Sequence, residues 1–560
     1  MLPRLAEKAI PPILWRIVVI AFFILLLAAG VILHDDYGGY TDEINHLRTG
    51  AIQYKMILSL FMPEAEIPEI PILKLNELPQ LEQYINRYYG EAVMLPTLFV
   101  AALPGVSFTD AAFLNFRRFY TFLNFFLAVI CFYRLIRLRF SNELLALLAA
   151  AMLVLSPRFF AESFYNSKDI VFFSWFLISI YLIAEYFFQP SRGRLFLFAA
   201  AAALACNTRI YGMVLYPAFL ILMGVSPNRT GESFWKKLKQ PVFAVALSLF
   251  FYWLISPFLW QDPLGNFLAS FNFASHQVGV TMENLTANVD TVSVGNAELF
   301  MGKLIAPKDY WYYLPVWMGI TIPVWYLVLF VAGIFSTVKR LFSQRLDAGL
   351  LFDLFTAGVF FGSLLAIISA SVTLYNGWRH VYFLYGPLLY LSVLGLAELG
   401  NFKSQHALRC SLRTVLTVGL CAASMLTTGV WMVKNHPLDF VYFNEIGRKN
   451  ADQFSRDYWG VSSKSCMLYL SSVSSGQSIR LAANNLLSAG AIDISLMRLP
   501  RSIQDQFELF WQPEHADYLC ISYDKMTGNS YPVDGFELMK SFTVDDYTIA
   551  SAYQRIKAAE

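Results

Sequence analysis

Acidic side chains cluster directly after the first apolar run of the chain. Residues 17–33 are apolar, and residues 34–46 then hold four carboxylates and two imidazoles. These belong to Asp35, Asp36, Asp42 and Glu43, and to His34 and His46. Neighbouring carboxylates repel each other, so the pKa of one can rise enough for it to act as a general base near neutral pH. The plainer interpretation is a solvated loop that ends a helix.

Basic side chains form the second set that could do chemistry. They are dispersed in the sequence, at Arg117, Arg118, Arg158, Lys168, Arg209, Arg379 and His380. Arginine suits phosphate recognition because its planar fork can bind two oxygens with charge-assisted hydrogen bonds. Any one of these residues is explained equally well as an interfacial side chain that contacts lipid headgroups. Arg379 and His380 favour the first interpretation, since they directly precede an apolar run on the expected outer side, where basic residues are disfavoured.

The segment 156–169 joins two apolar runs and is dense in polar groups for its length. It contains Arg158, Glu162, Lys168 and Asp169. Asp169 would start the next helix, where a carboxylate is favourable to the helix dipole. Lys168 and Asp169 are therefore explained either as part of a site or as an ion pair at a helix start.

The composition places these residues in a membrane protein. The 560 residues are 57% hydrophobic and only 15% charged, whereas a soluble chain carries about 25% charged residues. The chain is therefore expected to cross the bilayer many times. The formal net charge of +2 indicates neither an acidic nor a basic partner.

About eleven membrane spans are predicted from apolar runs that alternate with basic clusters. Arg4, Lys8 and Arg16 place the N-terminus in the cytoplasm, so residues 34–46 face outwards. Lys403 and Arg409 predict an inner loop before the last span, which leaves the C-terminus outside. The spans are expected at 17–33, 116–136, 144–155, 170–188, 195–206, 210–225, 242–257, 314–338, 351–374, 381–396 and 415–433.

The apolar piece 92–103 is not expected to cross. It is short, contains Pro96, and a crossing there would carry the next basic cluster to the outer side. We therefore expect residues 34–115 to form a long first external loop with juxtamembrane helices. The unusual polar residues then collect at the outer ends of helices, unlike those of ion or proton transporters, which lie near the midplane. This pattern favours an enzyme that acts at the outer leaflet.

The tail of the chain is more polar and predicts a small external α/β domain, so the expected domains are residues 1–433 and 434–560. Short strands are predicted at 466–471, 518–522 and 549–556, and a helix at 478–487. Cys466 and Cys520 would form a disulfide if the tail is exported.

Five short motifs occur in the order seen in C-type (GT-C) glycosyltransferases. They are Thr41-Asp42-Glu43-Ile44-Asn45-His46, Arg117-Arg118, Asn166-Ser167-Lys168-Asp169, Thr321-Ile322-Pro323 and Arg379-His380-Val381-Tyr382. Over residues 13–433 the chain resembles the dolichyl-phosphate-mannose–protein mannosyltransferase branch, and more distantly the lipid A aminoarabinose transferases.

The resemblance implies a GT-C-like membrane fold and a transfer of a hexose or pentose from a polyprenyl-phosphate-linked donor, with inversion, on the extracytoplasmic face. Asp42 would be the catalytic base, and Glu43 would orient it or bind acceptor or sugar. The donor phosphate would be held by Arg117, Arg118, Lys168, Arg379 and His380, with Asp36, His46, Glu162, Asp169 and Arg209 in supporting roles. No metal or other cofactor is expected, although the acidic cluster could bind a divalent ion.

Two departures from the family leave the acceptor open between protein, lipid and glycan. The family's fused external β-trefoil-type domain is replaced by residues 434–560, and that tail carries motifs of its own. These are Asn435-His436-Pro437, Tyr442-Phe443-Asn444 and Asp457-Tyr458-Trp459-Gly460. The alternatives are a flippase or other transporter of lipid-linked sugars, and a non-catalytic membrane scaffold. The expected location is the inner (plasma) membrane, with the bilayer, donor and acceptor as partners and no nucleic acid.

Overall fold

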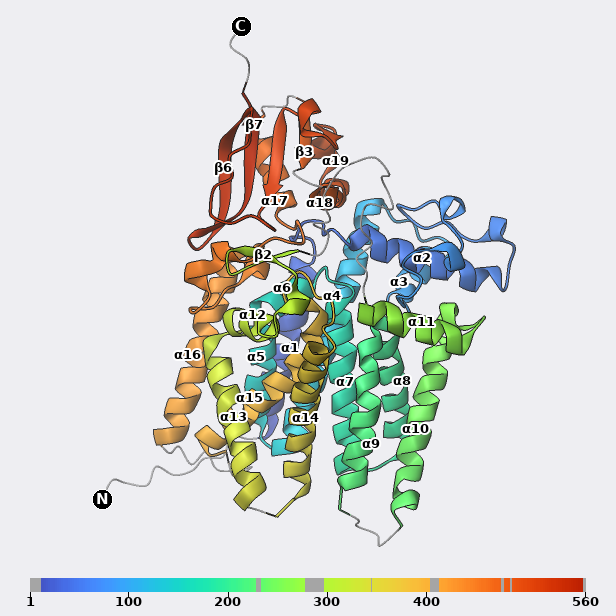
Figure 1. The fold of residues 1–560 in the computed structure, drawn as a ribbon, viewed down its shortest axis with the longest axis vertical. Coiled ribbons are helices and arrows are strands. Elements are labelled where there is room, and N and C mark those ends of the chain that lie inside the picture. The colour runs from blue at the N-terminus through green and yellow to red at the C-terminus, as the bar shows by residue number, and fades with distance from the viewer. Residues whose placement is uncertain are drawn as a thin grey trace.

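A bundle of helices carries a small β-sheet at one end in the computed structural model of the chain (Figure 1). The structure describes residues 12–227, 233–276, 297–343, 345–402, 412–474, 478–483 and 486–556. Arg4, Lys8, Lys403 and Arg409, on which part of the topology prediction rests, lie outside the described residues.

Seven helices in the described part of the chain are long and apolar enough to cross a membrane. They are α1 (Pro12–Leu33), α4 (Asp110–Phe140), α7 (Asp169–Phe188), α13 (Val324–Ser343), α14 (Ala348–Ser369), α15 (Tyr385–Gly400) with the 3₁₀ turn before it, and α16 (Leu412–Asn435). The predicted class, a helical multi-pass membrane protein with a C-terminal α/β part, is confirmed.

The remaining predicted spans are also helices, but they are shorter or less apolar. They are α5 (Glu143–Val154), α8 (Arg192–Thr208), α9 (Leu215–Val225) and α10 (Phe234–Leu254). Three lysines, Lys236, Lys237 and Lys239, fall in the first turns of α10 and lower its mean hydropathy. Helix α8 packs between α7 and α10, so these helices belong to the same bundle as the long ones.

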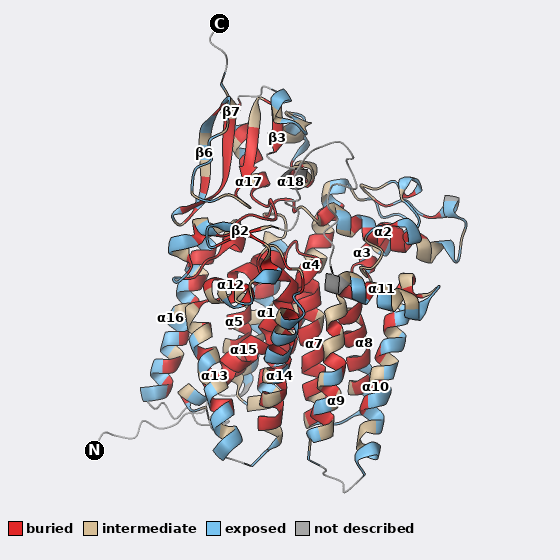
Figure 2. Cartoon of the chain, viewed as in Figure 1, coloured by how far each residue is buried: buried red, intermediate tan, exposed pale blue. Residues whose placement is uncertain are grey.

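Burial separates inner helices from outer ones (Figure 2). Helices α7 and α15 are almost entirely enclosed by the rest of the bundle, whereas α1, α13 and α16 expose much of their surface. On α1, for example, Leu25 is 69% and Ile32 is 71% exposed. A long helix that exposes such side chains is stable in hydrocarbon and not in water, so this surface is the one that lipid covers.

The segment between α1 and α4 forms short helices. Helices α2 (Glu43–Ser59) and α3 (Leu95–Ala101) lie at the end of the bundle that carries the sheet (Figure 1). Helix α3 has 7 residues, which is too few to cross a bilayer. Helix α4 begins at Asp110, earlier than predicted, because Oγ1 of Thr109 accepts a hydrogen bond from the backbone N of Ala112 and caps it.

The predicted span 314–338 is interrupted near its start. Helix α12 (Tyr313–Thr321) ends before Pro323, and α13 begins directly after it, because proline offers no amide hydrogen for a continuous helix. Short elements complete the connections at the same end of the bundle: α6 (Pro157–Glu162), α11 (Pro263–His276), β1 (Glu298–Phe300) and β2 (Lys303–Ile305).

The C-terminal part is a mixed sheet with helices against it. Its elements are α17 (Ser463–Val473), β3 (Ile479–Ala483), α18 (Leu486–Met497), α19 (Arg501–Gln504), β4 (Phe507–Phe510), β5 (Tyr518–Ser522), β6 (Phe536–Val544) and β7 (Tyr547–Arg555). The strand order is β4-β3-β5-β7-β6, with β3 parallel to β4 and β5, and β7 antiparallel to β5 and β6. The strands predicted at 518–522 and 549–556 are confirmed.

Two other predictions for this part are wrong. Residues 466–471 lie in helix α17, where the buried side chains of Cys466, Met467 and Leu470 recur at helical spacing. Residues 478–487, predicted as a helix, contain strand β3 and only the start of α18. Short apolar runs of this kind do not distinguish a buried strand from a buried helix, and packing against the sheet decides between them.

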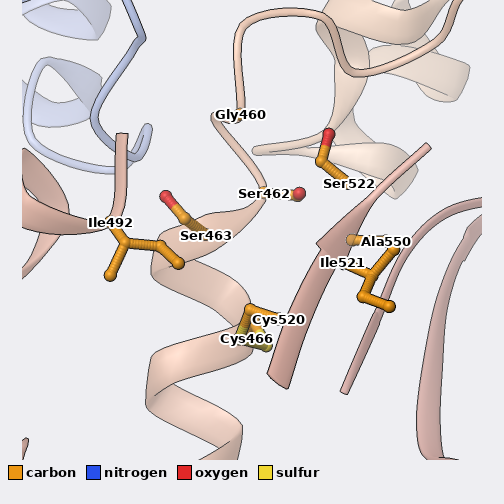
Figure 3. Close-up of a pocket in the computed structure, with 9 residues that line it drawn as sticks. All are labelled: Gly460, Ser462, Ser463, Cys466, Ile492, Cys520, Ile521, Ser522 and Ala550. Atoms are coloured by element: carbon orange, nitrogen blue, oxygen red, sulfur yellow. A yellow bond between two sulfur atoms is a disulfide. The ribbon is translucent and has the colours of Figure 1, made fainter. Parts of the chain in front are cut away.

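Cys466 of α17 and Cys520 of β5 form the predicted disulfide, with their Cα atoms 6.3 Å apart. Figure 3 shows the bond at the side of a small pocket that is also lined by Ser463 and Ser522. None of the residues that line this pocket belongs to the acidic or basic sets predicted to do chemistry.

The sheet end is pressed against the first external loop. The backbone N of Gly39 donates to Oγ of Ser495 at 2.7 Å, and a side chain at Gly39 would collide with the backbone at Ala491. Arg498 reaches across as well, because its Nη1 donates to the carbonyl oxygen of Tyr37 at 2.5 Å. The C-terminal part therefore sets the course of the loop that precedes α2.

Candidate active site

Asp42 and Arg379 come together at the end of the bundle that carries the sheet. Asp42 directly precedes α2, and Arg379 begins the 3₁₀ turn Arg379–Leu384 that leads into α15. Nη1 of Arg379 donates to Oδ2 of Asp42 at 3.1 Å. The side chain of Arg379 is 4% exposed, whereas that of Asp42 is 32% exposed. A buried guanidinium thus faces a carboxylate that solvent or a ligand can reach.

Asp169 and Arg209 extend this pair into a row of alternating charges. Asp169 is the first residue of α7, and Arg209 directly follows α8. Arg209 forms an ion pair with Asp169, and Nη1 of Arg379 lies 3.7 Å from Oδ2 of Asp169. The structure therefore brings together four of the predicted site residues from four segments that are distant in sequence.

The charge of Arg379 controls the ionisation of Asp42. Burial alone would raise the pKa of Asp42, but the positive charges of Arg379, His46 and Arg209 outweigh that effect. The pKa of Asp42 therefore lies below its ordinary value, and the side chain is a carboxylate at neutral pH. In this form it can accept a proton from a hydroxyl group placed against it.

Polar atoms of the turn that pairs with Asp42 have no hydrogen-bond partner in the described part of the chain. They are Nε of Arg379 and both ring nitrogens of His380, although each of these two residues is only 3% exposed. The ring of Tyr375 covers both, 4.8 Å from the guanidinium carbon of Arg379 and 4.5 Å from the centre of the His380 ring. Buried polar groups are normally hydrogen-bonded, so these atoms indicate a place for an anionic ligand such as a phosphate.

Three other basic residues predicted to hold phosphate are engaged by protein groups. Arg118 pairs with Glu43, Nη1 of Arg117 donates to Thr97 at 2.7 Å, and Nζ of Lys168 lies 3.1 Å from Glu91. Glu43, predicted to act next to Asp42, is thus directed towards Arg118. Arg379 and His380 have unpaired polar atoms in the described part of the chain, as do Arg158 at Nη2 and Arg209 at Nε.

His46 and Asp36 each hydrogen-bond to side chains outside the charged row. His46 is one helical turn after Asp42, and its Nδ1 lies 3.2 Å from the hydroxyl oxygen of Tyr40 and 3.3 Å from that of Ser167. Asp36 instead accepts from Nε2 of His436 at 2.8 Å, so it contacts one of the motifs peculiar to the tail.

Glu162 is enclosed beneath the site. Its carboxylate accepts from Nδ2 of Asn166 at 2.7 Å and from the hydroxyl of Tyr382 at 2.7 Å. The hydroxyl of Tyr458, from the tail, adds a third bond at 3.3 Å. Burial raises the pKa of Glu162 to about 7 against the effect of these hydrogen bonds. Glu162 thus ties α6 to the turn before α15 and to the tail.

Sequence reasoning missed Tyr375 and Trp459 as neighbours of Arg379. The guanidinium carbon of Arg379 lies 4.4 Å from the centre of the Trp459 ring. Trp459 belongs to the motif Asp457-Tyr458-Trp459-Gly460, which is visible in the sequence as a feature of the tail. Its contact with Arg379 joins segments that are distant in the chain, and no spacing rule predicts such a contact.

The middle of the chain matches the sequence model of a known family. Residues 115–260 match the sequence model of the family described as dolichyl-phosphate-mannose-protein mannosyltransferase. Over this range the chain is similar to the C-type membrane glycosyltransferases. The matched range contains Lys168, Asp169 and Arg209, whereas Asp42 and Arg379 lie outside it. The resemblance predicted from the sequence motifs is confirmed.

Two solved structures are similar to the whole chain at low sequence identity. The archaeal oligosaccharyltransferase AglB from Archaeoglobus fulgidus, in complex with an inhibitory peptide and a dolichol-phosphate, is 11% identical, with a TM-score of 0.48 over 91% of this chain and 69% of its own. ArnT from Cupriavidus metallidurans, bound to undecaprenyl phosphate, is 10% identical, with a TM-score of 0.42 over 98% of this chain and 99% of its own. No curated protein sequence matches the chain.

Proposed function

We propose that this glycosyltransferase moves a sugar from a polyprenyl-phosphate-linked donor to a hydroxyl group of an acceptor on the extracytoplasmic face, with Asp42 as the base. The observation that carries the proposal is the pairing of Asp42 with Arg379 at 3.1 Å. It places a partly exposed proton acceptor beside a buried cation that can receive a phosphate.

The proposed residues act on opposite faces of the anomeric carbon of the donor sugar. The acceptor hydroxyl gives its proton to Asp42 while its oxygen attacks the anomeric carbon. The bond from that carbon to the phosphate oxygen breaks, and the lipid phosphate leaves with the electron pair. Arg379 and His380 offset the charge that develops on the leaving phosphate. Attack from the face opposite the leaving group gives inversion at the anomeric carbon.

The unpaired nitrogens explain how a donor would bind without first breaking the ion pair. Nε of Arg379 and the ring nitrogens of His380 have no partner in the described part of the chain. Once the ring of Tyr375 moves aside, Nε and the protonated ring nitrogen can donate to phosphate oxygens while Nη1 stays on Asp42. Arg209, held by Asp169, keeps a second positive charge next to the row. In this proposal the other basic residues position the protein groups that they contact and do not bind the phosphate; they are Lys168, Arg117 and Arg118.

The orientation in the membrane follows from the same end of the bundle. The disulfide between Cys466 and Cys520 is of a kind that persists in oxidising compartments, which supports an extracytoplasmic sheet. The sheet, α2 and the charged row share one end of the bundle (Figure 1), which supports a reaction on the outer side. The proposal then has a cytoplasmic N-terminus and an enzyme in the inner (plasma) membrane.

The proposal is tested with the full-length protein in liposomes and polyprenyl phosphates that carry radiolabelled hexoses or pentoses. Release of polyprenyl phosphate and transfer of label to membrane acceptors are measured. Asp42→Asn should lower the rate by a factor of about 10² to 10⁴, the range for loss of a general base. Asp309→Asn, in the exposed turn Pro307–Asp309, is the matched control and should keep the wild-type rate.

Wild-type transfer rates in folded Asp42→Asn would contradict the assignment of the base. Movement of the labelled donor across the bilayer without cleavage of its sugar–phosphate bond would instead identify a flippase. Absence of both activities, with the protein folded and the donors in the membrane, would favour a non-catalytic scaffold.

A further inference from the structure

Trp459 lies where the tail meets the charged row. Its carbonyl oxygen accepts two hydrogen bonds from Thr41, one from the backbone N and one from Oγ1, both at 3.0 Å. Thr41 directly precedes Asp42, so these two bonds fix the backbone from which the proposed base projects. This contact comes from the main chain of Trp459 and is independent of its side chain.

The side chain of Trp459 fixes the other member of the pair. Its ring lies against the guanidinium of Arg379, 4.4 Å from the guanidinium carbon, an arrangement that attracts a cation to the ring face. The ring also meets the edge of the Tyr40 ring, with centroids 5.4 Å apart. Trp459 is 1% exposed, and its Nε1 has no hydrogen-bond partner in the described part of the chain. Packing, and not a hydrogen bond of the indole, therefore holds the ring.

The turn that carries Trp459 is itself rigidly attached to the sheet. The carboxylate of Asp457 accepts from the backbone N of Val461 and of Ser462, both at 3.0 Å. Gly460 has a φ of +72°, a conformation that residues with a side chain rarely adopt. Oγ of Ser522, in β5, donates to the carbonyl oxygen of Asp457 at 2.5 Å. The position of Trp459 is thus set by the C-terminal sheet.

We propose that Trp459 is a positioning residue of the active site, through which the C-terminal sheet sets the distance between Asp42 and Arg379. The inference rests on the proposed function and deepens it. One residue of the tail holds the segment of the base with its carbonyl oxygen and the phosphate-binding cation with its ring. The tail is then a structural part of the catalytic site and more than a module that recognises an acceptor.

The experiment compares Trp459→Leu with Trp459→Phe in the full-length protein in liposomes. Kinetic constants for the polyprenyl-phosphate sugar and the pH profile of kcat/KM are measured. Trp459→Leu should lower kcat by about 100-fold, the scale of a 1 Å misplacement, with a smaller change in KM. Water admitted beside Arg379 weakens its effect on Asp42, so the acid limb of the profile should move up by about one pH unit. Trp459→Phe keeps an aromatic face, so it should retain most of the rate, and the acid limb of its pH profile should stay at the wild-type pH.

Trp431→Leu is the matched control. Trp431 is also a buried tryptophan that joins the bundle to the tail, because its Nε1 donates to Asp545 at 2.9 Å, and it should lower stability without moving the acid limb. Thr41→Val removes only the hydroxyl bond to Trp459, so it tests the same contact if Trp459→Leu does not fold. It should lower kcat and move the limb in the same direction.

Two results would overturn the proposal. One is a Trp459→Leu or Thr41→Val variant with wild-type kcat and an unmoved acid limb. The other is a Trp459→Phe variant as inactive as Trp459→Leu, because the indole N–H would then contact a ligand directly. If the wild type transfers no sugar, the proposed function fails by itself. The contact is then tested by a double-mutant cycle, in which the unfolding midpoints of Trp459→Leu, Arg379→Leu and the double variant are compared with that of the wild type. Non-additive shifts of the midpoint support the contact, and additive shifts contradict it.

Discussion

Arg118 and Glu43 form a two-point ion pair inside the protein. Nη2 of Arg118 lies 2.6 Å from Oε2 of Glu43, and Nε lies 3.0 Å from Oε1. The same guanidinium donates to the carbonyl oxygens of Tyr37 and Gly38 at 2.9 and 2.8 Å. All three nitrogens of Arg118 are thus occupied by the loop that leads to Asp42. This geometry gives the pair a structural role one residue away from the proposed base.

Removal of Arg118 should therefore be costly for folding. Arg118→Leu would leave the carboxylate of Glu43 buried without its cation, a change that costs about 3–5 kcal/mol, and we expect a marked fall of the unfolding midpoint in detergent. Arg134→Leu is the control, because Arg134 is 57% exposed and lies 3.4 Å from Glu185. Exposed pairs contribute about 0–1 kcal/mol. Equal midpoints for the two variants would contradict the structural role of Arg118.

The raised pKa of Glu162 predicts how the free energy of unfolding depends on pH. Burial raises its pKa from 4.5 to about 7, so the folded protein keeps a proton that the unfolded chain has already lost in this window. The free energy of unfolding should therefore fall as the pH rises from about 4.5 to about 7. Glu162→Gln removes this contribution, and its midpoint should fall less over the same window. The exposed Glu537, changed to Gln, should leave the slope unaltered; an unaltered slope in Glu162→Gln would refute the assignment.

Cysteine labelling tests the orientation of the bundle. The free cysteines of the described residues, Cys131, Cys206 and Cys421, are buried. With Cys410, which lies outside the described residues, replaced by serine, introduced cysteines can be labelled over a low background. An impermeant maleimide added from outside should label Lys308→Cys, in the turn before α12, and spare Ser343→Cys, at the other end of α13. Labelling of the second variant and not the first would invert the proposed topology.

The membrane helices could be predicted from sequence because lipid imposes a single requirement, a run of apolar residues of sufficient length. The break of one span at Pro323 follows from the missing amide hydrogen of proline, and the sequence shows it. The secondary structure of the tail was harder to predict, since residues 466–471 and 478–487 are short apolar runs. Whether such a run forms a helix or a strand depends on the strands that pack against it, and the local sequence pattern does not show which strands these are.

Asp42 and Arg379 could be singled out before their contact was known. Each is an ionisable residue at the outer end of an apolar run, where an unpaired charge is costly, and each lies in a motif shared with C-type glycosyltransferases. The partners of Arg118 and Arg117 could not be assigned in this way. Guanidinium groups that bind phosphate and guanidinium groups that bind protein carboxylates have the same sequence signature, and only geometry separates them.

The docking of Arg498 and Ser495 on the loop at Tyr37 and Gly39 has a consequence for biosynthesis. The loop emerges from the ribosome long before the residues that hold it, since Gly39 and Ser495 are 456 residues apart in the chain. The membrane helices can enter the bilayer in the meantime, but the Asp42 loop takes its final path only after the sheet has folded. A chain that stops short of Trp459 would thus occupy the membrane without an assembled site, and completion of that site waits for the synthesis of the sheet.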